Sequence, residues 1–190
     1  MSLLDIHVLG SPVLRQETTP VATVTDEIRR LIDDMFETMY AAHGIGLAAP
    51  QVGRTERVTV VDVTRDQGDK HPIALVNPEI VLREGTTRGE EGCLSIPEVF
   101  GEVDRAMRVV VRALDRDGRP IEIDGTELLA RCLQHEIDHL HGRLFIDHLS
   151  LLKRRAALAT WDEEKGKYPD LRRSAVPPAL IAEHHDDAEL

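Results

Sequence analysis

The chain has 190 residues, a length that suits one domain with a sizeable core. Its net charge of -11 argues against direct, specific nucleic-acid binding and against attachment to an anionic membrane. Two cysteines provide no disulfide framework, the N-terminus lacks the pattern of a signal peptide, and no apolar stretch approaches the roughly 20 residues of a membrane span. We therefore expect a cytoplasmic protein with reduced thiols.

The predicted elements follow one another in an α+β order. Thr25 is a candidate N-cap for a first helix, in which apolar residues recur at helical spacing over 28–40 and which Gly44 ends. Strand-like runs lie at 58–63, 73–76, 80–82, 107–114 and, after the hairpin signal Asp117-Gly118, 120–123. A second helix is predicted over about 126–141, and a third over 151 to about 165.

The most informative segment is Gln134-His135-Glu136-Ile137-Asp138-His139, within the second predicted helix. Residues four apart lie one above the other on a helix, so His135 and His139 can present two imidazoles to one metal ion. Glu136 follows the first of these ligands and is placed to move a proton of metal-activated water. The alternative is an amphipathic helix with two surface histidines.

A catalytic metal site usually has three protein ligands, so one more is needed. One class of zinc endopeptidase has a third histidine where this chain has Phe145, which cannot bind a metal. His141 and His148 are other downstream candidates. Cys132 lies about 10 Å along the helix axis from His139, which is too far for one ion to bridge easily. We therefore interpret Cys132 as a pocket or core residue.

The second cysteine, Cys93, lies in the segment Glu91-Gly92-Cys93-Leu94-Ser95-Ile96-Pro97. A lone cysteine is commonly a small buried apolar residue. The glycine before Cys93 and the proline after it instead favour an irregular, exposed backbone, which suits a metal-ligand loop.

A glycine-rich segment, Gly44-Ile45-Gly46-Leu47-Ala48-Ala49-Pro50-Gln51, follows the first predicted helix. A dinucleotide-binding fingerprint needs a strand before it and a helix after it, whereas here a helix precedes and Pro50 obstructs a following helix. The segment is therefore either a turn into the next strand or a loop that approaches a ligand closely. In the second case Gln51 is a candidate amide donor.

Together the three segments resemble the polypeptide deformylase family, through G-I-G-L-A-A-P-Q at 44–51, E-G-C-L-S at 91–95 and Q-H-E-I-D-H at 134–139. The layout agrees over about residues 3–160. We expect one domain over residues 1–165, in which antiparallel or mixed sheets pack around a central metal-binding helix, with an N-terminal and a C-terminal helix. The acidic, proline-containing tail at 166–190 lies outside the resemblance and is expected to be partly disordered.

The resemblance implies a metal-dependent hydrolase that removes the formyl group from the N-terminal formyl-methionine of nascent polypeptides and releases formate. A metal-bound water is the implied nucleophile, and the implied ion is Fe²⁺, which Zn²⁺, Ni²⁺ or Co²⁺ can replace. The implied roles are metal ligand for Cys93, His135 and His139, general base and acid for Glu136, and oxyanion donor for Gln51 and the backbone N–H of Leu94.

Substrate recognition is predicted from helix faces and from the two glycine-containing segments. The expected substrate-binding residues are Leu128, Arg131 and Cys132 around the methionine side chain, and the backbone near Ile45, Gly46 and Gly92 along an extended peptide. Arg131 is unusual in an apolar pocket, and we expect its stem to pack there while its charge reaches solvent.

Two further positions bear on the peptide beyond the methionine. Many relatives have an arginine where this chain has Phe100. Arg105 either replaces that arginine at the substrate or pairs with Glu91 behind the metal ligands.

The third predicted helix carries a basic cluster, Lys153, Arg154 and Arg155, on an otherwise acidic protein. In some relatives a basic C-terminal helix docks on the ribosome, so the cluster is either such a docking surface or an ordinary solvated helix face. Two other functions also remain open, a zinc endopeptidase of the H-E-x-x-H type and a non-catalytic binding homologue.

Overall fold

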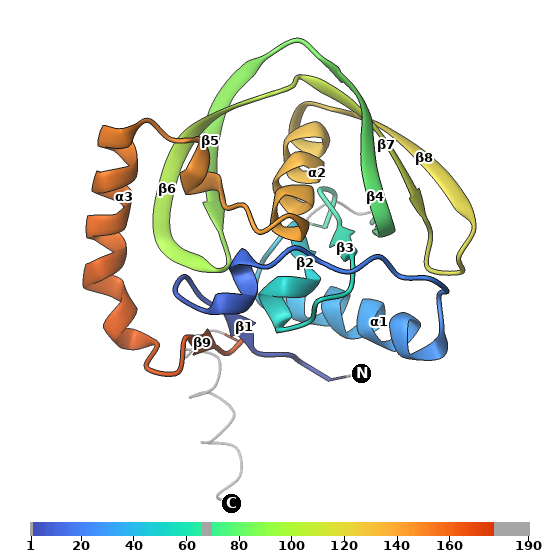
Figure 1. Cartoon of the computed structure of the whole chain (residues 1–190), viewed down its shortest axis with the longest axis horizontal. Coiled ribbons are helices and arrows are strands. Elements are labelled where there is room, and N and C mark those ends of the chain that lie inside the picture. Colours follow the sequence, from blue (N-terminus) through green and yellow to red (C-terminus); the bar gives the residue numbers. More distant parts are fainter. Residues whose placement is uncertain (1, 66–69, 177–190) are drawn as a thin grey trace, which may run out of the picture.

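The computed structural model describes residues 2–65 and 70–176, and it has the predicted α+β architecture (Figure 1). Its α-helices are α1 (Asp26–Ala41), α2 (Glu127–Leu140) and α3 (Leu151–Glu164). Short 3₁₀ helices are η1 (Pro12–Arg15), η2 (Ala49–Val52), η3 (Phe145–His148) and η4 (Lys165–Lys167). No helix in this part of the chain is long and apolar enough to cross a membrane.

Within the described residues, the strands form one five-stranded antiparallel sheet and two small ones. The large sheet has the order β2-β3-β4-β7-β8 and comprises β2 (Gly46–Ala48), β3 (Val58–Val61), β4 (Ile73–Glu84), β7 (Arg108–Leu114) and β8 (Pro120–Thr126). The two small sheets pair β5 (Thr87–Cys93) with β6 (Ile96–Arg105), and β1 (Ile6–His7) with β9 (Arg172–Arg173).

Helix α2 runs through the centre, with the β5–β6 hairpin on one side and the large sheet on the other (Figure 1). It starts directly after β8, and its apolar side chains form one core cluster with residues of the sheet. Nine of its residues are buried, including His135, Glu136 and His139. The predicted arrangement of sheets around a central helix is therefore confirmed.

Helix α1 forms where the sequence predicts it. The Thr25 side chain accepts a hydrogen bond from the backbone N–H of Ile28, and Asp26 and Glu27 occupy the first turn, where acidic groups favour a helix N-terminus. Its apolar face packs on β2 and β3. The helix ends at Ala41, three residues before the predicted stop at Gly44.

The hairpin and the long strand β4 differ from the sequence-based expectation. The prediction of an irregular, exposed loop at Cys93 is wrong, because Cys93 is the half-buried last residue of β5 and pairs with Ile96 of β6 after a register shift. The predicted runs at 73–76 and 80–82 are parts of one strand, which continues through two register shifts. Asn77, at φ 53°, lies at the first shift and explains why the apolar pattern is interrupted there.

The chain after α3 folds back on the domain. Trp161 of α3 is buried and stacks on Tyr168, with ring centroids 5.9 Å apart. Strand β9 then pairs with β1, and Tyr168, Leu171 and Ala175 of the predicted tail pack against the domain. The remainder of that tail, 177–190, lies outside the described residues.

Candidate active site

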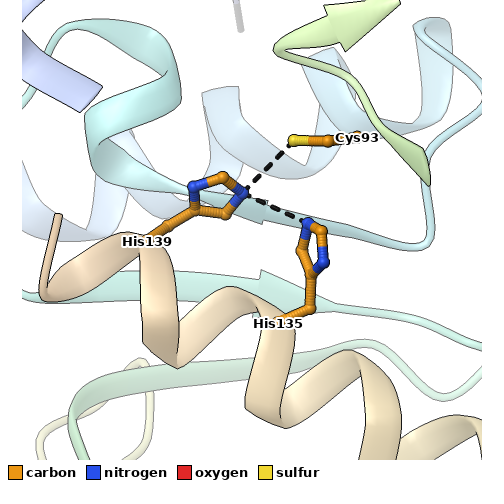
Figure 2. A group of neighbouring side chains, drawn as sticks. All are labelled: Cys93, His135 and His139. Atoms are coloured by element: carbon orange, nitrogen blue, oxygen red, sulfur yellow. Dashed lines mark hydrogen bonds between the residues drawn. The ribbon is translucent and has the colours of Figure 1, made fainter. Parts of the chain in front are cut away.

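Three side chains from two elements converge beside α2 (Figure 2). His135 and His139 project from the same face of α2, and their Nε2 atoms are 3.2 Å apart. The Cys93 Sγ atom, at the end of β5, lies 3.3 Å from the His139 Nε2 atom. The three ligand atoms all lie within 4.8 Å of one another. Helical spacing brings the two histidines together, whereas the hairpin brings the cysteine to them.

Glu91 sets which nitrogen of His135 faces this cluster. The Nδ1–H group of His135 donates a hydrogen bond of 3.0 Å to the Glu91 carboxylate, which leaves the Nε2 lone pair directed at Cys93 and His139. Burial alone would raise the pKa of Glu91, but hydrogen bonds from His135 and Arg105 outweigh burial and lower that pKa far below its usual range.

Arg105 pairs with Glu91 rather than replacing the missing substrate arginine. Its side chain is buried, donates to both Glu91 carboxylate oxygens at 2.9 and 3.0 Å, and also binds Asp138 of α2. His148 in turn contacts Asp138 at 2.8 Å and is not a metal ligand. A buried ionic network therefore holds the hairpin against α2.

The prediction for the charge of Arg131 is wrong. Its guanidinium does not reach solvent, because it donates to Glu91 at 2.8 Å and to backbone carbonyls of both hairpin strands, including Val103 at 2.9 Å and Thr87 at 3.0 Å. These acceptors are available because β5 and β6 form a two-stranded sheet whose outer edges carry unpaired carbonyls. Arg131 therefore lines the cavity and links α2 to the hairpin through these hydrogen bonds.

Glu136 lies against the backbone of β2, and only a glycine permits this. A Cβ atom built on Gly46 would come within 2.7 Å of the Glu136 carboxyl carbon. Oxygen Oε2 of Glu136 is buried without a hydrogen-bond partner among the described residues, and burial raises the pKa of the carboxyl to about 7. A carboxyl with these properties is suited to exchanging a proton with a bound reactant.

The Gln51 amide is held with its nitrogen toward the hairpin. Its Oε1 atom accepts from the backbone N–H of Ala48 at 2.8 Å, and its Nε2 atom donates to Ser95 Oγ at 3.2 Å and lies 3.5 Å from Cys93 Sγ. Leu94 lies in the hairpin turn directly after Cys93. The two predicted oxyanion donors therefore both lie next to the cysteine, Gln51 from η2 and Leu94 as the following residue of the chain.

One cavity of about 390 Å³ joins most of the predicted residues. It is lined by Ile45, Gly46, Gln51, Gly92, Cys93, Leu94, Leu128, Arg131, Cys132, His135 and Glu136. Ser95 accepts a hydrogen bond from Gln51 and orients it, and this role is not predicted from the sequence although Ser95 belongs to the E-G-C-L-S segment. Arg173 also lines the cavity, and no sequence pattern gives a signal for it.

The donor set fits a divalent transition-metal ion. One sulfur and two imidazole nitrogens within 4.8 Å form a set suited to iron, zinc, nickel or cobalt. Two imidazole nitrogens 3.2 Å apart cannot both carry a proton, so at least one lone pair is directed into the cluster. Glu136, with its unpartnered Oε2 atom, belongs to the lining of the same cavity.

Comparison with known proteins agrees with this geometry. A peptide deformylase of Alkalilimnicola ehrlichii is 57% identical over 155 residues, which cover 82% of this chain and 86% of the relative. The solved peptide deformylase of Legionella pneumophila superposes with a TM-score of 0.83 at 47% identity, covering 89% of this chain and 99% of that one. A peptide deformylase of Ehrlichia chaffeensis in complex with actinonin gives a TM-score of 0.82 at 40% identity, with coverage of 89% and 99%.

The sequence model of the polypeptide deformylase family matches residues 3–155. This match covers all three segments that suggested the resemblance, together with the whole of α1, α2 and the large sheet. The chain belongs to the polypeptide deformylase family.

Proposed function

We propose that this protein is a metal-dependent hydrolase that removes the N-terminal formyl group from the formyl-methionine of nascent polypeptides. The observation that carries the proposal is the convergence of Cys93, His135 and His139 beside an unpartnered buried carboxylate, Glu136, in one cavity. The family and the high identity of its named members support the same activity.

The proposed reaction cleaves the carbon–nitrogen bond of the formyl amide with one water molecule. The water oxygen adds to the formyl carbon while Glu136 accepts a proton from that water. The Glu136 carboxyl then gives the proton to the departing amine as the carbon–nitrogen bond breaks. The products are formate and a free N-terminal methionine. The Gln51 amide and the Leu94 backbone N–H are the proposed donors to the formyl oxygen, where negative charge develops.

Cys93, His135 and His139 would hold one divalent ion, for which Fe²⁺ is proposed and Zn²⁺, Ni²⁺ or Co²⁺ would substitute. Such an ion supplies Lewis acidity, which polarises a carbonyl and lowers the pKa of water. The hydrogen bond from His135 to Glu91 supports this role, because it fixes the imidazole with Nε2 free. A ferrous thiolate site should lose activity in air.

The proposed methionine pocket is bounded by Leu128, Arg131 and Cys132 of α2. Leu128 is half exposed at the cavity wall, and Cys132 is buried with its thiol 3.5 Å from the carbonyl oxygen of Ile45. The backbone of Ile45 and Gly46 on one wall and of Gly92 on the other would bind the peptide as an added strand. Both segments line the same cavity, which supports an extended substrate.

The two alternative functions have less support. Phe145, at the position of the third histidine of the protease class, is buried and stacks on His135 with ring centroids 6.4 Å apart. A non-catalytic homologue would not need an unpartnered buried carboxylate such as Glu136, which is costly to keep in a folded protein.

We also propose a cytoplasmic location in a bacterial cell, where formylated chains are made, with the activity carried by residues 1–165. Direct binding to nucleic acid or membrane is not proposed, because the net charge is -11. Docking on the ribosome through Lys153, Arg154 and Arg155 is a separate proposal. Lys153 pairs with Glu102 and Arg154 with Asp147, so part of this charge is already neutralised.

The deciding experiment measures formate release from an amidated formyl-Met-Ala-Ser peptide by protein purified without oxygen or reloaded with Ni²⁺. Glu136→Gln preserves the shape of the side chain but cannot accept a proton, so kcat should fall by about 10²- to 10⁴-fold at unchanged metal content. Glu127→Gln, an exposed change on the same helix, should retain activity. A fully metallated wild-type protein that released no formate would contradict the proposal, and cleavage of an unformylated peptide would favour the protease.

A further inference from the structure

The segment after α3 reaches the active-site cavity although it lies beyond residues 3–155, which match the family. In β9, Arg173 pairs with Ile6 of β1. Arg173 is half-buried and lines the same cavity as Cys93 and His135. Its neighbour Arg172 is exposed and does not line that cavity. The two adjacent arginines are therefore in different environments.

The segment is anchored on both sides of Arg173. Before it, Tyr168 stacks on the buried Trp161, and the Leu171 carbonyl accepts a backbone hydrogen bond of 2.9 Å from the residue that follows β1. After it, Ala175 is 2% exposed and packs in a small cluster with residues of β1 and α1. A guanidinium held by such a segment loses little backbone freedom when it binds a ligand.

The anchoring places the segment that follows β9 beside the hairpin turn. The cluster around Ala175 also includes Leu94, which follows the ligand Cys93 in the hairpin turn. An extended peptide advances about 3.3 Å per residue. Cys93 and Arg173 line the same cavity, so an extended peptide whose formyl group lies at Cys93 would carry its next residues along the wall that includes Arg173.

Arg173 differs in its partners from the other arginine of the cavity. The Arg131 guanidinium is bound to Glu91 and to hairpin carbonyls. The side chain of Arg173 has no ion-pair or hydrogen-bond partner within residues 2–65 and 70–176. Although the protein has a net charge of -11, the Arg173 guanidinium is a positive group on the cavity wall that is available to a ligand.

We infer that Arg173 is a specificity residue that binds a carboxylate side chain at the second or third position of the formylated peptide. A guanidinium pairs with a carboxylate through two parallel N–H···O hydrogen bonds, which a neutral amide of the same shape cannot match. The inference rests on the proposed deformylase function, because it names a preference among the substrates of that reaction.

The test compares kcat/KM for amidated formyl-Met-Glu-Ser and formyl-Met-Ser-Glu with the same peptides carrying glutamine in place of glutamate. Amidation removes the terminal carboxylate, so any preference arises from the side chain. For the wild-type protein, we expect a Glu/Gln ratio of about three to ten at one of the two positions, the size of one partly exposed charge-assisted contact. The ratio should decrease at high salt.

The variants separate a local contact from a general charge effect. Arg173→Gln should bring the ratio to about one, Arg173→Lys should retain part of it because a single charge remains, and Arg172→Gln should keep the wild-type ratio. A wild-type ratio of one or less, an unchanged ratio in Arg173→Gln, or an equal loss in Arg172→Gln would overturn the inference. Each of these results leaves the deformylase function intact, whereas no formate from any of the four peptides would overturn that function and the inference with it.

Discussion

Helices α2 and α3 each have 14 residues but occupy opposite environments. Nine residues of α2 are buried, among them three charged or polar side chains of the active site, whereas only Ala157 and Trp161 of α3 are buried. Figure 1 shows the reason, since α2 passes between the hairpin and the large sheet while α3 covers the outside of β6.

The difference explains where chemistry is placed in this fold. Around α2, water is largely excluded, so Glu91 can hold His135 in one tautomer and Glu136 can have a raised pKa. Charges on α3, such as Lys153, remain in solvent, where ion pairs add little. Substitutions of the buried side chains of α2 and of their partners should therefore change stability and catalysis together. Substitutions on α3 should change stability without removing catalysis, or should change neither.

Glu91→Gln should have the largest effect on both properties. The change removes the buried carboxylate that Arg105 and Arg131 share and leaves only Asp138 to pair with Arg105, which costs about 3–5 kcal/mol of unfolding free energy. Metal affinity should also fall by about 10- to 100-fold, because a neutral amide replaces the charged carboxylate that accepts from His135 and orients it. Urea unfolding and a competitive metal titration measure the two losses, with the exposed Glu102→Gln as the control. Wild-type metal affinity in Glu91→Gln would break the proposed link between the ionic network and the site.

Trp161→Ala should destabilise the protein without removing its chemistry. Trp161 is 4% exposed, and truncation of such a side chain costs about 3–5 kcal/mol. The loss of its stacking on Tyr168 should also loosen β9, so the Glu/Gln preference attributed to Arg173 should decline while formate release from a neutral peptide continues below the unfolding temperature. Trp161→Phe should restore most of both properties. Loss of metal binding in Trp161→Ala would show that α3 supports the site more directly than its packing suggests.

Charge reversal of Lys153, Arg154 and Arg155 should have the smallest effect on the isolated protein. These side chains lie on the solvated start of α3, so the rate of formate release from a short peptide should be unchanged. If the cluster docks on the ribosome, co-sedimentation with ribosomes should be lost and should depend on salt. Co-sedimentation that survives the triple change would remove the docking proposal.

The elements with the strongest local signals could be predicted from sequence. Helices α1 and α2 follow from apolar residues at helical spacing and, for α1, from the cap at Thr25. The spacing of four between His135 and His139 is enough to place two imidazoles together, because it depends only on helix geometry. The remaining site residues were assigned by resemblance, since no local rule connects positions 51, 93 and 135.

The rest was decided by tertiary structure. The β5–β6 hairpin is rich in charged residues and has no clear alternation, so its strands were not predicted, yet it pairs through seven register positions and carries Cys93 to α2. The position of the Arg131 guanidinium depends on backbone carbonyls at the edges of the hairpin, which no local sequence pattern reveals. Arg173 reaches the cavity only because β9 pairs with β1, about 165 residues earlier in the chain.

The sequence by itself therefore determined the helices, the pair of histidines and, through three short segments, the family. These features depend on residues that are close together in the chain, where helix geometry leaves few alternatives. The tertiary structure alone decided which carboxylate supports His135, where the Arg131 charge lies and that a C-terminal arginine lines the cavity. Those contacts join distant segments, and their positions are set by packing of the whole chain rather than by any local preference.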